Sequence, residues 1–203
     1  MTYVMALDQG TSSSRAIIYN SQGEVVGTAQ QTFDSIYPHD GWVEQDPDTL
    51  WQSILQVGRQ AIAAASIEPA QVKAIGITNQ RETTLLWDRQ TGECLYNAIV
   101  WQDRRGADRC IAMAGEQLAD GRDLASTINQ ITGLIIDPYF SSTKLAWLLS
   151  NVPQAQSKAE AGELCFGTVD SYLIWQLTTG VSHVTDATNA SRTQLFDICA
   201  NQW

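Results

Sequence analysis

The chain has 203 residues, of which 44% are hydrophobic and 17% are charged, and its formal net charge is −10. This composition is typical of a globular protein with a sizeable core and excludes a disordered chain. Nucleic acid is disfavoured as a partner, because a phosphate backbone needs a basic face and the sequence has no cluster of Lys and Arg.

The cysteine pattern bears on metal binding and on the cellular compartment. The chain has four cysteines without a C-x-x-C pair, and neither histidine lies beside one: Cys94, Cys110, Cys165 and Cys199. We therefore expect no zinc site. Scattered thiols fit a reducing compartment. The sequence shows no signal peptide and no apolar run of about 20 residues, so we expect a cytoplasmic protein without a membrane span.

The first predicted elements are three strands at residues 4–7, 15–19 and 24–29, joined by short polar turns as a β-meander. A helix is predicted to follow from Pro47, with Asp46 as its N-cap. Its apolar residues recur at helical spacing, at Leu50, Ile54, Val57 and Ala61.

Further along, residues 72–77 predict a buried strand, residues 83–87 another strand, and residues 98–101 a third apolar stretch. Residues 144–149 predict a helix that ends before Pro153. Asp170 is expected to cap a second helix over residues 171–177. Strands mixed with helices indicate an α/β fold, which we expect to form one domain over residues 1–203.

The stretch LDQGTSSSR, residues 7–15, ends a predicted strand in a carboxylate, followed by small and hydroxyl-bearing residues. Small residues let backbone N–H groups approach an anion, and hydroxyls add donors. Arg15 can clamp a phosphate, and Asp8 can hold a hydrated Mg²⁺ ion beside it. The spacing differs from that of a Walker A loop. On these residues alone, an ordinary polar turn stays open as the alternative.

The stretch ITNQRETT, residues 77–84, runs from a strand directly into polar residues. Open α/β sheets bind ligands at this end of their strands. Arg81 offers a fork of donors and Glu82 a pair of acceptors, which together suit hydroxyl groups. A solvated loop with a local ion pair is the alternative.

Late in the chain, VTDATNASRT forms either a site-facing loop or an ordinary connection; its charged residues include Asp186 and Arg192.

Two more segments place aromatic residues near strand and helix ends. NAIVWQDRR carries Trp101, which is either a flat wall for a carbon skeleton or a core residue. IDPYFSSTK carries Tyr139. Either the Tyr139 hydroxyl reaches a ligand, or the ring only packs at the start of a helix. The helix that follows is expected to be capped by one of three residues, Ser141, Ser142 or Thr143.

Together and in this order, the segments resemble the N-terminal part of the FGGY carbohydrate kinases. The match is carried by ALDQGTSSSRAI, GWVEQDP, ITNQRETT, NAIVWQDRR, DPYFSSTKLAW, FGTVDSYLIW and VTDATNASRT, and it spans residues 3–203. NQRET and DPYFSSTK are typical of the branch that acts on glycerol. The resemblance implies a ribonuclease-H-like domain of the actin, hexokinase and Hsp70 superfamily, with a mixed sheet that opens on the β-meander and is flanked by helices.

The resemblance also implies an activity, the ATP-dependent phosphorylation of glycerol to glycerol 3-phosphate. Asp8 would lie near Mg²⁺, through water, in a supporting catalytic role. The ATP phosphates would face four residues of the same loop: Thr11, Ser12, Ser13 and Arg15. Glycerol hydroxyls would bond to Arg81, Glu82 and Tyr139, and Trp101 would pack against the glycerol carbons.

Members of the family are longer, with two domains that close on a cleft, and the resemblance places the general base beyond Trp203. We therefore expect the 203 residues alone to be inactive, and a homo-oligomer stays open for the intact enzyme. The alternatives are a kinase for a related polyol or ketose, and a non-catalytic binding module.

Overall fold

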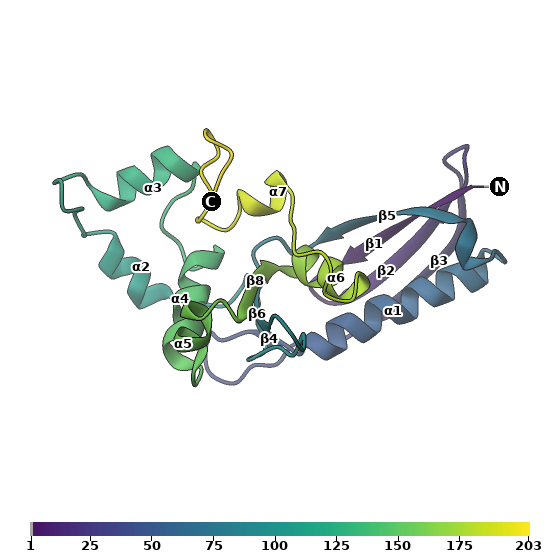
Figure 1. The fold of residues 1–203 in the computed structure, drawn as a ribbon, viewed down its shortest axis with the longest axis horizontal. Coiled ribbons are helices and arrows are strands. Elements are labelled where there is room, and N and C mark those ends of the chain that lie inside the picture. The colour runs from purple at the N-terminus through teal and green to yellow at the C-terminus, as the bar shows by residue number, and fades with distance from the viewer. Residues whose placement is uncertain (1) are drawn as a thin grey trace. The chain divides into compact units, whose positions relative to one another are not determined.

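The computed structural model describes residues 2–203, which divide into two compact units (Figure 1). The first unit contains residues 2–35 and 45–80, and the second contains residues 36–44 and 81–203. Each unit holds strands and helices of its own, as predicted for an α/β chain. That residues 1–203 act as one domain stays a prediction.

The first unit is built on a four-stranded sheet of order β3-β2-β1-β5. Strands β1 (Tyr3–Gln9), β2 (Ser13–Tyr19) and β3 (Val25–Thr32) are antiparallel neighbours, which confirms the predicted meander. Strand β5 (Val72–Asn79) pairs with β1 in parallel and follows the short 3₁₀ helix η1 (Pro69–Gln71). The ends of β1 and β5 therefore lie at the same edge of the sheet.

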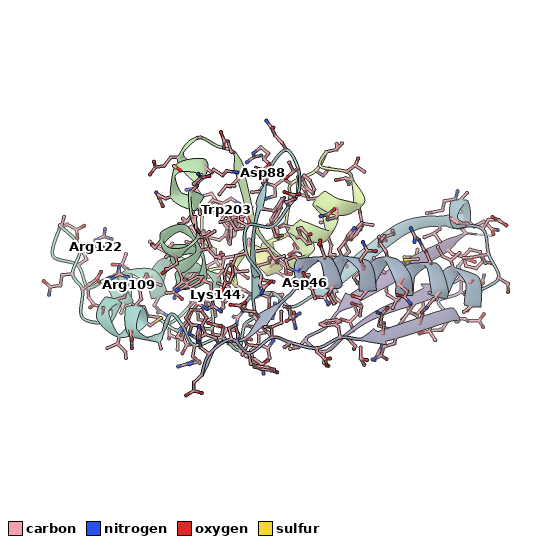
Figure 2. The ribbon with its side chains drawn as sticks, turned by 90° about the horizontal axis from the view of Figure 1, so that it is seen from below. Asp46, Asp88, Arg109, Arg122, Lys144 and Trp203 are labelled. Carbon is pink, nitrogen blue, oxygen red and sulfur yellow. The ribbon has the colours of Figure 1, made fainter. Side chains whose placement is uncertain are left out.

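One face of this sheet is covered by helix α1 (Pro47–Ala64). Asp46 caps the helix as predicted, because its carboxylate accepts from the backbone N–H groups of the first turn (Figure 2). The helix packs closely on β3, where a Cβ added to Gly27 would lie 2.4 Å from the Ala61 carbonyl oxygen. The predicted apolar face is buried, at Leu50, Ile54, Val57 and Ala61.

The prediction that residues 72–77 form a buried strand is correct for the strand and wrong for the burial. Strand β5 lies at the end of the sheet, and α1 packs on β1, β2 and β3. Its residues 73–76 are exposed, and Ile75 retains 47% of its accessible surface. An apolar run indicates a strand but does not tell whether another element covers it.

The second unit contains a sheet of order β4-β7-β6-β8. Its strands are β4 (Glu44–Gln45), which contributes Glu44 to this unit, β7 (Ala98–Ile99), β6 (Thr84–Asp88) and β8 (Leu164–Thr168). β6 is antiparallel to both β7 and β8. The apolar stretch at residues 98–101 is thus a short strand followed by a turn that carries Trp101. The hydrophobic core of the second unit includes Leu86, Ile99, Leu148, Ala155 and Leu164.

Two predicted helices of the second unit are present, but their predicted caps are wrong. Helix α4 (Ser141–Asn151) has Phe140 as its N-cap, without a side-chain bond, so none of the three hydroxyl residues caps it. Helix α6 (Val169–Leu177) has Thr168 at its N-cap, and Asp170 lies inside the helix. The Asp170 carboxylate instead accepts from the hydroxyls of Thr168 and Thr185, and burial raises its pKa.

Four shorter helices were not predicted, although the one over residues 124–132 carries local signals, with Asp123 as its N-cap and Leu124, Ile128 and Ile131 at helical spacing. They are α2 (Ala107–Met113), α3 (Leu124–Thr132), α5 (Ala155–Glu160) and α7 (Ala187–Ala190). Among residues 2–203, no helix combines the length and the apolar character that crossing a membrane requires.

Candidate active site

The first unit presents a hairpin, β1–β2, whose two charged residues face each other. Asp8 and Arg15 are direct partners in the antiparallel register. Their neighbours Gln9 and Ser14 are buried, and Ser14 bonds to Ser53 of α1 at 2.7 Å. Because side chains alternate along a strand, Asp8 and Arg15 lie on the face of the sheet opposite α1. Among residues 2–203, the half-buried Asp8 carboxylate has no hydrogen bond or ion pair.

The loop at the hairpin tip is held by the side-chain amides of two buried glutamines. The Gln80 side chain donates to the Gly10 carbonyl oxygen at 3.0 Å, and the Gln45 side chain donates to the Thr11 carbonyl oxygen at 2.7 Å. These two amides also bond to each other at 2.9 Å. The Gly10 N–H donates to the Ser13 carbonyl oxygen at 2.9 Å, and a Cβ on Gly10 would lie 3.1 Å from that oxygen. The loop conformation is therefore fixed by the protein itself.

The predicted phosphate-facing residues all lie on this hairpin. Thr11 and Ser13 are half-buried, whereas Ser12 and Arg15 are exposed. Gln30 joins two of them, because its side chain donates to the Ser13 hydroxyl at 3.0 Å and accepts from Arg15 Nη2 at 3.1 Å. Gln30 lies on β3 and is not among the site residues predicted from the sequence.

In the second unit, the turn before β6 places Arg81 and Glu82 against the segment around α7. Glu82 is only 5% exposed, and its Oε1 accepts from Arg192 Nε at 2.6 Å. Arg81 is exposed, and its Nη1 lies 3.5 Å from the Thr188 carbonyl oxygen. The ion-pair partner of Glu82 is thus Arg192, which lies 110 positions away in the sequence.

The two predicted aromatic residues join the same group of side chains. The rings of Trp101 and Tyr139 meet edge to face, with centroids 5.5 Å apart. The Arg192 guanidinium carbon lies 5.8 Å from the Tyr139 ring and 5.1 Å from the Phe140 ring. A continuous set of contacts therefore links Glu82, Arg192, Tyr139 and Trp101, which we call the polyol cluster after the ligand that the sequence analysis predicts for it. Arg192 had been noted only as part of a polar segment.

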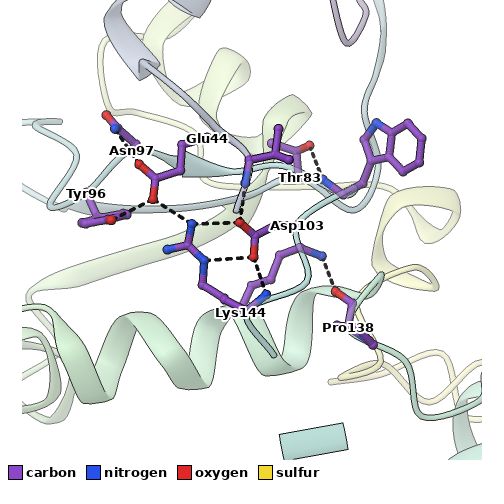
Figure 3. Close-up of polar contacts among 10 residues, drawn as sticks. Glu44, Thr83, Tyr96, Asn97, Asp103, Pro138 and Lys144 are labelled. Atoms are coloured by element: carbon purple, nitrogen blue, oxygen red, sulfur yellow. Dashed lines mark hydrogen bonds and ion pairs between the residues drawn. The ribbon is translucent and has the colours of Figure 1, made fainter. Parts of the chain in front are cut away.

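Lys144 supports this cluster and was missed, because a lysine in a helix is normally solvated. It is 1% exposed, on the first turns of α4 (Figure 2). Its Nζ donates to the carbonyl oxygens of Pro138 at 2.9 Å, Tyr139 at 2.5 Å and Phe140 at 3.2 Å, and Figure 3 shows the first of these bonds. Burial lowers the pKa of Lys144 to about 7.

A second buried cation, Arg105, anchors the turn that follows β7 through its partners Glu44 and Asp103, which are labelled in Figure 3. Its Nη2 bonds to Glu44 at 2.7 Å and to Asp103 at 2.8 Å, and all three side chains are at most 2% exposed. Its guanidinium carbon lies 3.8 Å from the Trp42 ring centroid and 4.4 Å from that of Trp147. We call these five residues the Arg105 cluster. It fixes the turn in which Trp101 lies.

Comparison with known proteins identifies the family of the chain. Residues 3–203 match the FGGY family of carbohydrate kinases, N-terminal domain. The chain is 57% identical over all 203 residues to a glycerol kinase of Variovorax paradoxus, and 55% identical to that of Albidiferax ferrireducens. It covers 40% of each relative, so it spans about two fifths of their length.

Solved structures give the same fold. The glycerol kinase of Plasmodium falciparum, crystallised with ADP, superposes on the whole chain with a TM-score of 0.92 at 33% identity, and 39% of that protein is covered. A gluconate kinase from Lactobacillus acidophilus, with a TM-score of 0.84, 23% identity and 38% of its chain covered, shows the fold alone. The predicted resemblance and fold class are confirmed, and the chain belongs to the FGGY family of carbohydrate kinases.

Proposed function

We propose that this chain forms the N-terminal part of an ATP-dependent glycerol kinase, which transfers the γ-phosphoryl group of ATP to a terminal hydroxyl of glycerol. The observation that carries the proposal is the polyol cluster, a buried carboxylate held by an arginine beside two aromatic rings. The relatives that are more than half identical to the chain carry the name glycerol kinase, which supports the same substrate.

The polyol cluster suits a small molecule that has hydroxyls on a short carbon chain. A carboxylate has about four acceptor positions, and Arg192 occupies one oxygen of Glu82, so further positions remain for hydroxyl donors. Arg81 offers donors, and Tyr139 both donates and accepts. The Trp101 ring supplies an apolar surface for the carbon atoms. Because Glu82 is engaged by a guanidinium, we assign it to orienting glycerol and place the general base in the region that follows residue 203 in the relatives.

The hairpin of the first unit suits the phosphates of ATP. Hydroxyls of Thr11, Ser12 and Ser13 and the guanidinium of Arg15 are donors for phosphate oxygens. Because buried amides hold the loop from behind, these donors are ordered before the nucleotide binds, and little ordering is required on binding. Phosphoryl transfer depends chiefly on such positioning and charge neutralisation.

The same hairpin fits a magnesium ion. Mg²⁺ is usually held by one or two carboxylates together with phosphate oxygens and water. Asp8 meets this requirement, since its carboxylate lacks a partner among residues 2–203 and stands beside the phosphate-facing donors. When bound, the ion would neutralise the charge on the transferring group. Asp8 would hold it through water.

We place the enzyme in the cytoplasm, where ATP is available and thiols stay reduced, which suits the four free cysteines of the chain. A homo-oligomer of the intact enzyme is compatible with this function and is tested by sedimentation of the full-length protein.

The experiment joins residues 1–203 to the C-terminal remainder of the Variovorax paradoxus relative, which gives a full-length protein that we call the hybrid kinase. A coupled assay then compares glycerol with xylulose and gluconate. We expect the hybrid kinase to phosphorylate glycerol preferentially. The 203 residues alone should stay below about 1 s⁻¹, the low end for kinases. Preference for a ketose, or turnover by the 203 residues alone, would contradict the proposal.

A further inference from the structure

Lys144 gathers three successive carbonyl oxygens around one nitrogen. The oxygens belong to Pro138, Tyr139 and Phe140, and all lie within 3.2 Å of Nζ. A lysine ammonium has three N–H donors, so this arrangement satisfies each of them. It also provides a partner for the carbonyl oxygens that immediately precede α4.

The backbone that Lys144 holds carries a residue of the polyol cluster. The Tyr139 ring contacts Trp101 and Phe140 and lies next to Arg192. Apart from Lys144, the segment is held by Asp137, whose carboxylate accepts from the Tyr139 N–H at 2.8 Å. Lys144 therefore holds the backbone from which the Tyr139 ring and hydroxyl extend, and its own N–H donors are used by the three carbonyl oxygens.

We propose that Lys144 is a positioning residue of the polyol site, which fixes Tyr139 through the backbone and makes glycerol binding depend on the protonation of its amine. This inference rests on the proposed function, because it assigns Tyr139 to the glycerol site. A neutral amine has two N–H donors and a lone pair. After deprotonation, one of the three carbonyl oxygens loses its donor and faces that lone pair, so the segment must shift.

The surroundings of Lys144 allow this titration near neutral pH. Burial lowers its pKa to about 7, and the positive end of α4 also disfavours the charge. Carboxylates from three other segments and the Cys110 thiol of α2 favour the charge. Each carboxylate, however, already has an arginine partner: Asp103 with Arg105, Glu82 with Arg192, and Asp137 with Arg104. None of the three carboxylates therefore has Lys144 as its sole ion-pair partner.

The kinetic test follows the KM for glycerol and the KM for ATP of the hybrid kinase from pH 6 to pH 9. We expect the KM for glycerol to rise about tenfold through neutral pH, as for the loss of one hydrogen bond to a charged group, with the KM for ATP changing little. Lys144→Met should show the high KM for glycerol at every pH. Lys158→Met, at a half-exposed lysine, should keep the wild-type profile.

A purely structural role would give another pattern, in which Lys144→Met lowers kcat and raises both KM values together with a loss of thermal stability. A KM for glycerol that does not change with pH in the wild type, or the same pH profile in Lys144→Met, would overturn the inference.

A second measurement does not depend on activity or on the folding of the Lys144 variant. The chain has three lysines, Lys73, Lys144 and Lys158. ¹³C-labelled lysine in the 203-residue chain therefore gives three side-chain signals, and Lys73→Met and Lys158→Met assign the third by elimination. We expect the Lys144 signal to titrate with a pKa of about 7.

The two measurements separate the two proposals. If the Lys144 signal titrates near neutral pH but the hybrid kinase does not act on glycerol, the proposed function fails and the titration of Lys144 stands. If the hybrid kinase acts on glycerol and the Lys144 signal does not titrate near neutral pH, the proposed function stands and the inference about Lys144 is wrong.

Discussion

Replacing Glu82 by Gln tests whether this carboxylate recognises glycerol directly. The change keeps the shape of the side chain and removes its charge. In the structure, Glu82 is 5% exposed and bonds to Arg192 at 2.6 Å. The Arg192 side chain is 28% exposed, so water can solvate its guanidinium after the substitution. We therefore expect the fold to tolerate Glu82→Gln with a loss of about 1 kcal/mol, as for a partly exposed ion pair.

The effect on glycerol should be larger. A hydrogen bond to a charged group contributes about 1.5–3 kcal/mol. Since 1.36 kcal/mol corresponds to a factor of ten, kcat/KM for glycerol should fall about 10- to 150-fold. The KM for ATP should change little, because the donors that we propose for the phosphates lie on the β1–β2 hairpin, whereas the Glu82 carboxylate bonds to Arg192.

Steady-state kinetics of the hybrid kinase measure this effect, and a double-mutant cycle with Arg192→Met separates two explanations. If Glu82 binds glycerol directly, Glu82→Gln still lowers kcat/KM when Arg192 is already Met. If Glu82 serves only to hold Arg192, the second substitution adds nothing to the first. Complete coupling, or an equal rise in the KM for ATP, would refute the assignment of Glu82 to the polyol.

Three further predictions concern single charges. In the hybrid kinase, Asp8→Asn should lower kcat much more than glycerol affinity, and raising Mg²⁺ should restore part of it; a loss that only follows the melting temperature would contradict this. Arg105→Ala leaves two buried carboxylates unpaired and should lower the unfolding free energy by about 3–5 kcal/mol in urea, whereas Arg109→Ala, in an exposed pair, should lower it by about 1 kcal/mol or less. Burial raises the pKa of Asp170, so the folded protein holds this proton more tightly than the unfolded chain. The unfolding free energy of the wild type should therefore fall relative to Asp170→Asn as pH rises above about 4, and parallel curves would be the contrary result.

Local features of the fold were predictable where a local signal determines them. Helix α1 is marked by Asp46 at its cap and by apolar residues at helical spacing, and both signals act within the helix. The meander follows from short strands joined by polar turns. The exposure of β5 was not predictable, because it depends on which residues α1 covers. The prediction that Asp170 caps α6 was wrong, because the Asp170 carboxylate bonds to Thr185, which lies beyond the end of the helix.

The residues of the candidate site, too, were predictable only where a local sequence signal marks them. Glu82, Trp101 and Tyr139 were identified because each follows a strand or precedes a helix in a polar segment. Arg192 and Lys144 were not, because their roles depend on contacts made in the folded chain. The pair of Arg192 with Glu82 spans 110 positions, and Lys144 is buried although lysine is usually solvated.

The Arg105 cluster also bears on how fast the protein unfolds. Its ion pair with Glu44 joins residues 61 positions apart, and its two rings come from separate segments, Trp42 on the N-terminal side of Arg105 and Trp147 on the C-terminal side. Long-range contacts of this kind require closure of large loops, so we expect the cluster to form late, after the folding barrier. Interactions absent from the transition state slow unfolding and leave the folding rate unchanged. Trimming Trp42 to leucine should therefore shorten the lifetime of the native state while refolding proceeds at its former rate. The cluster would thus set how long the site, once assembled, survives before the chain opens.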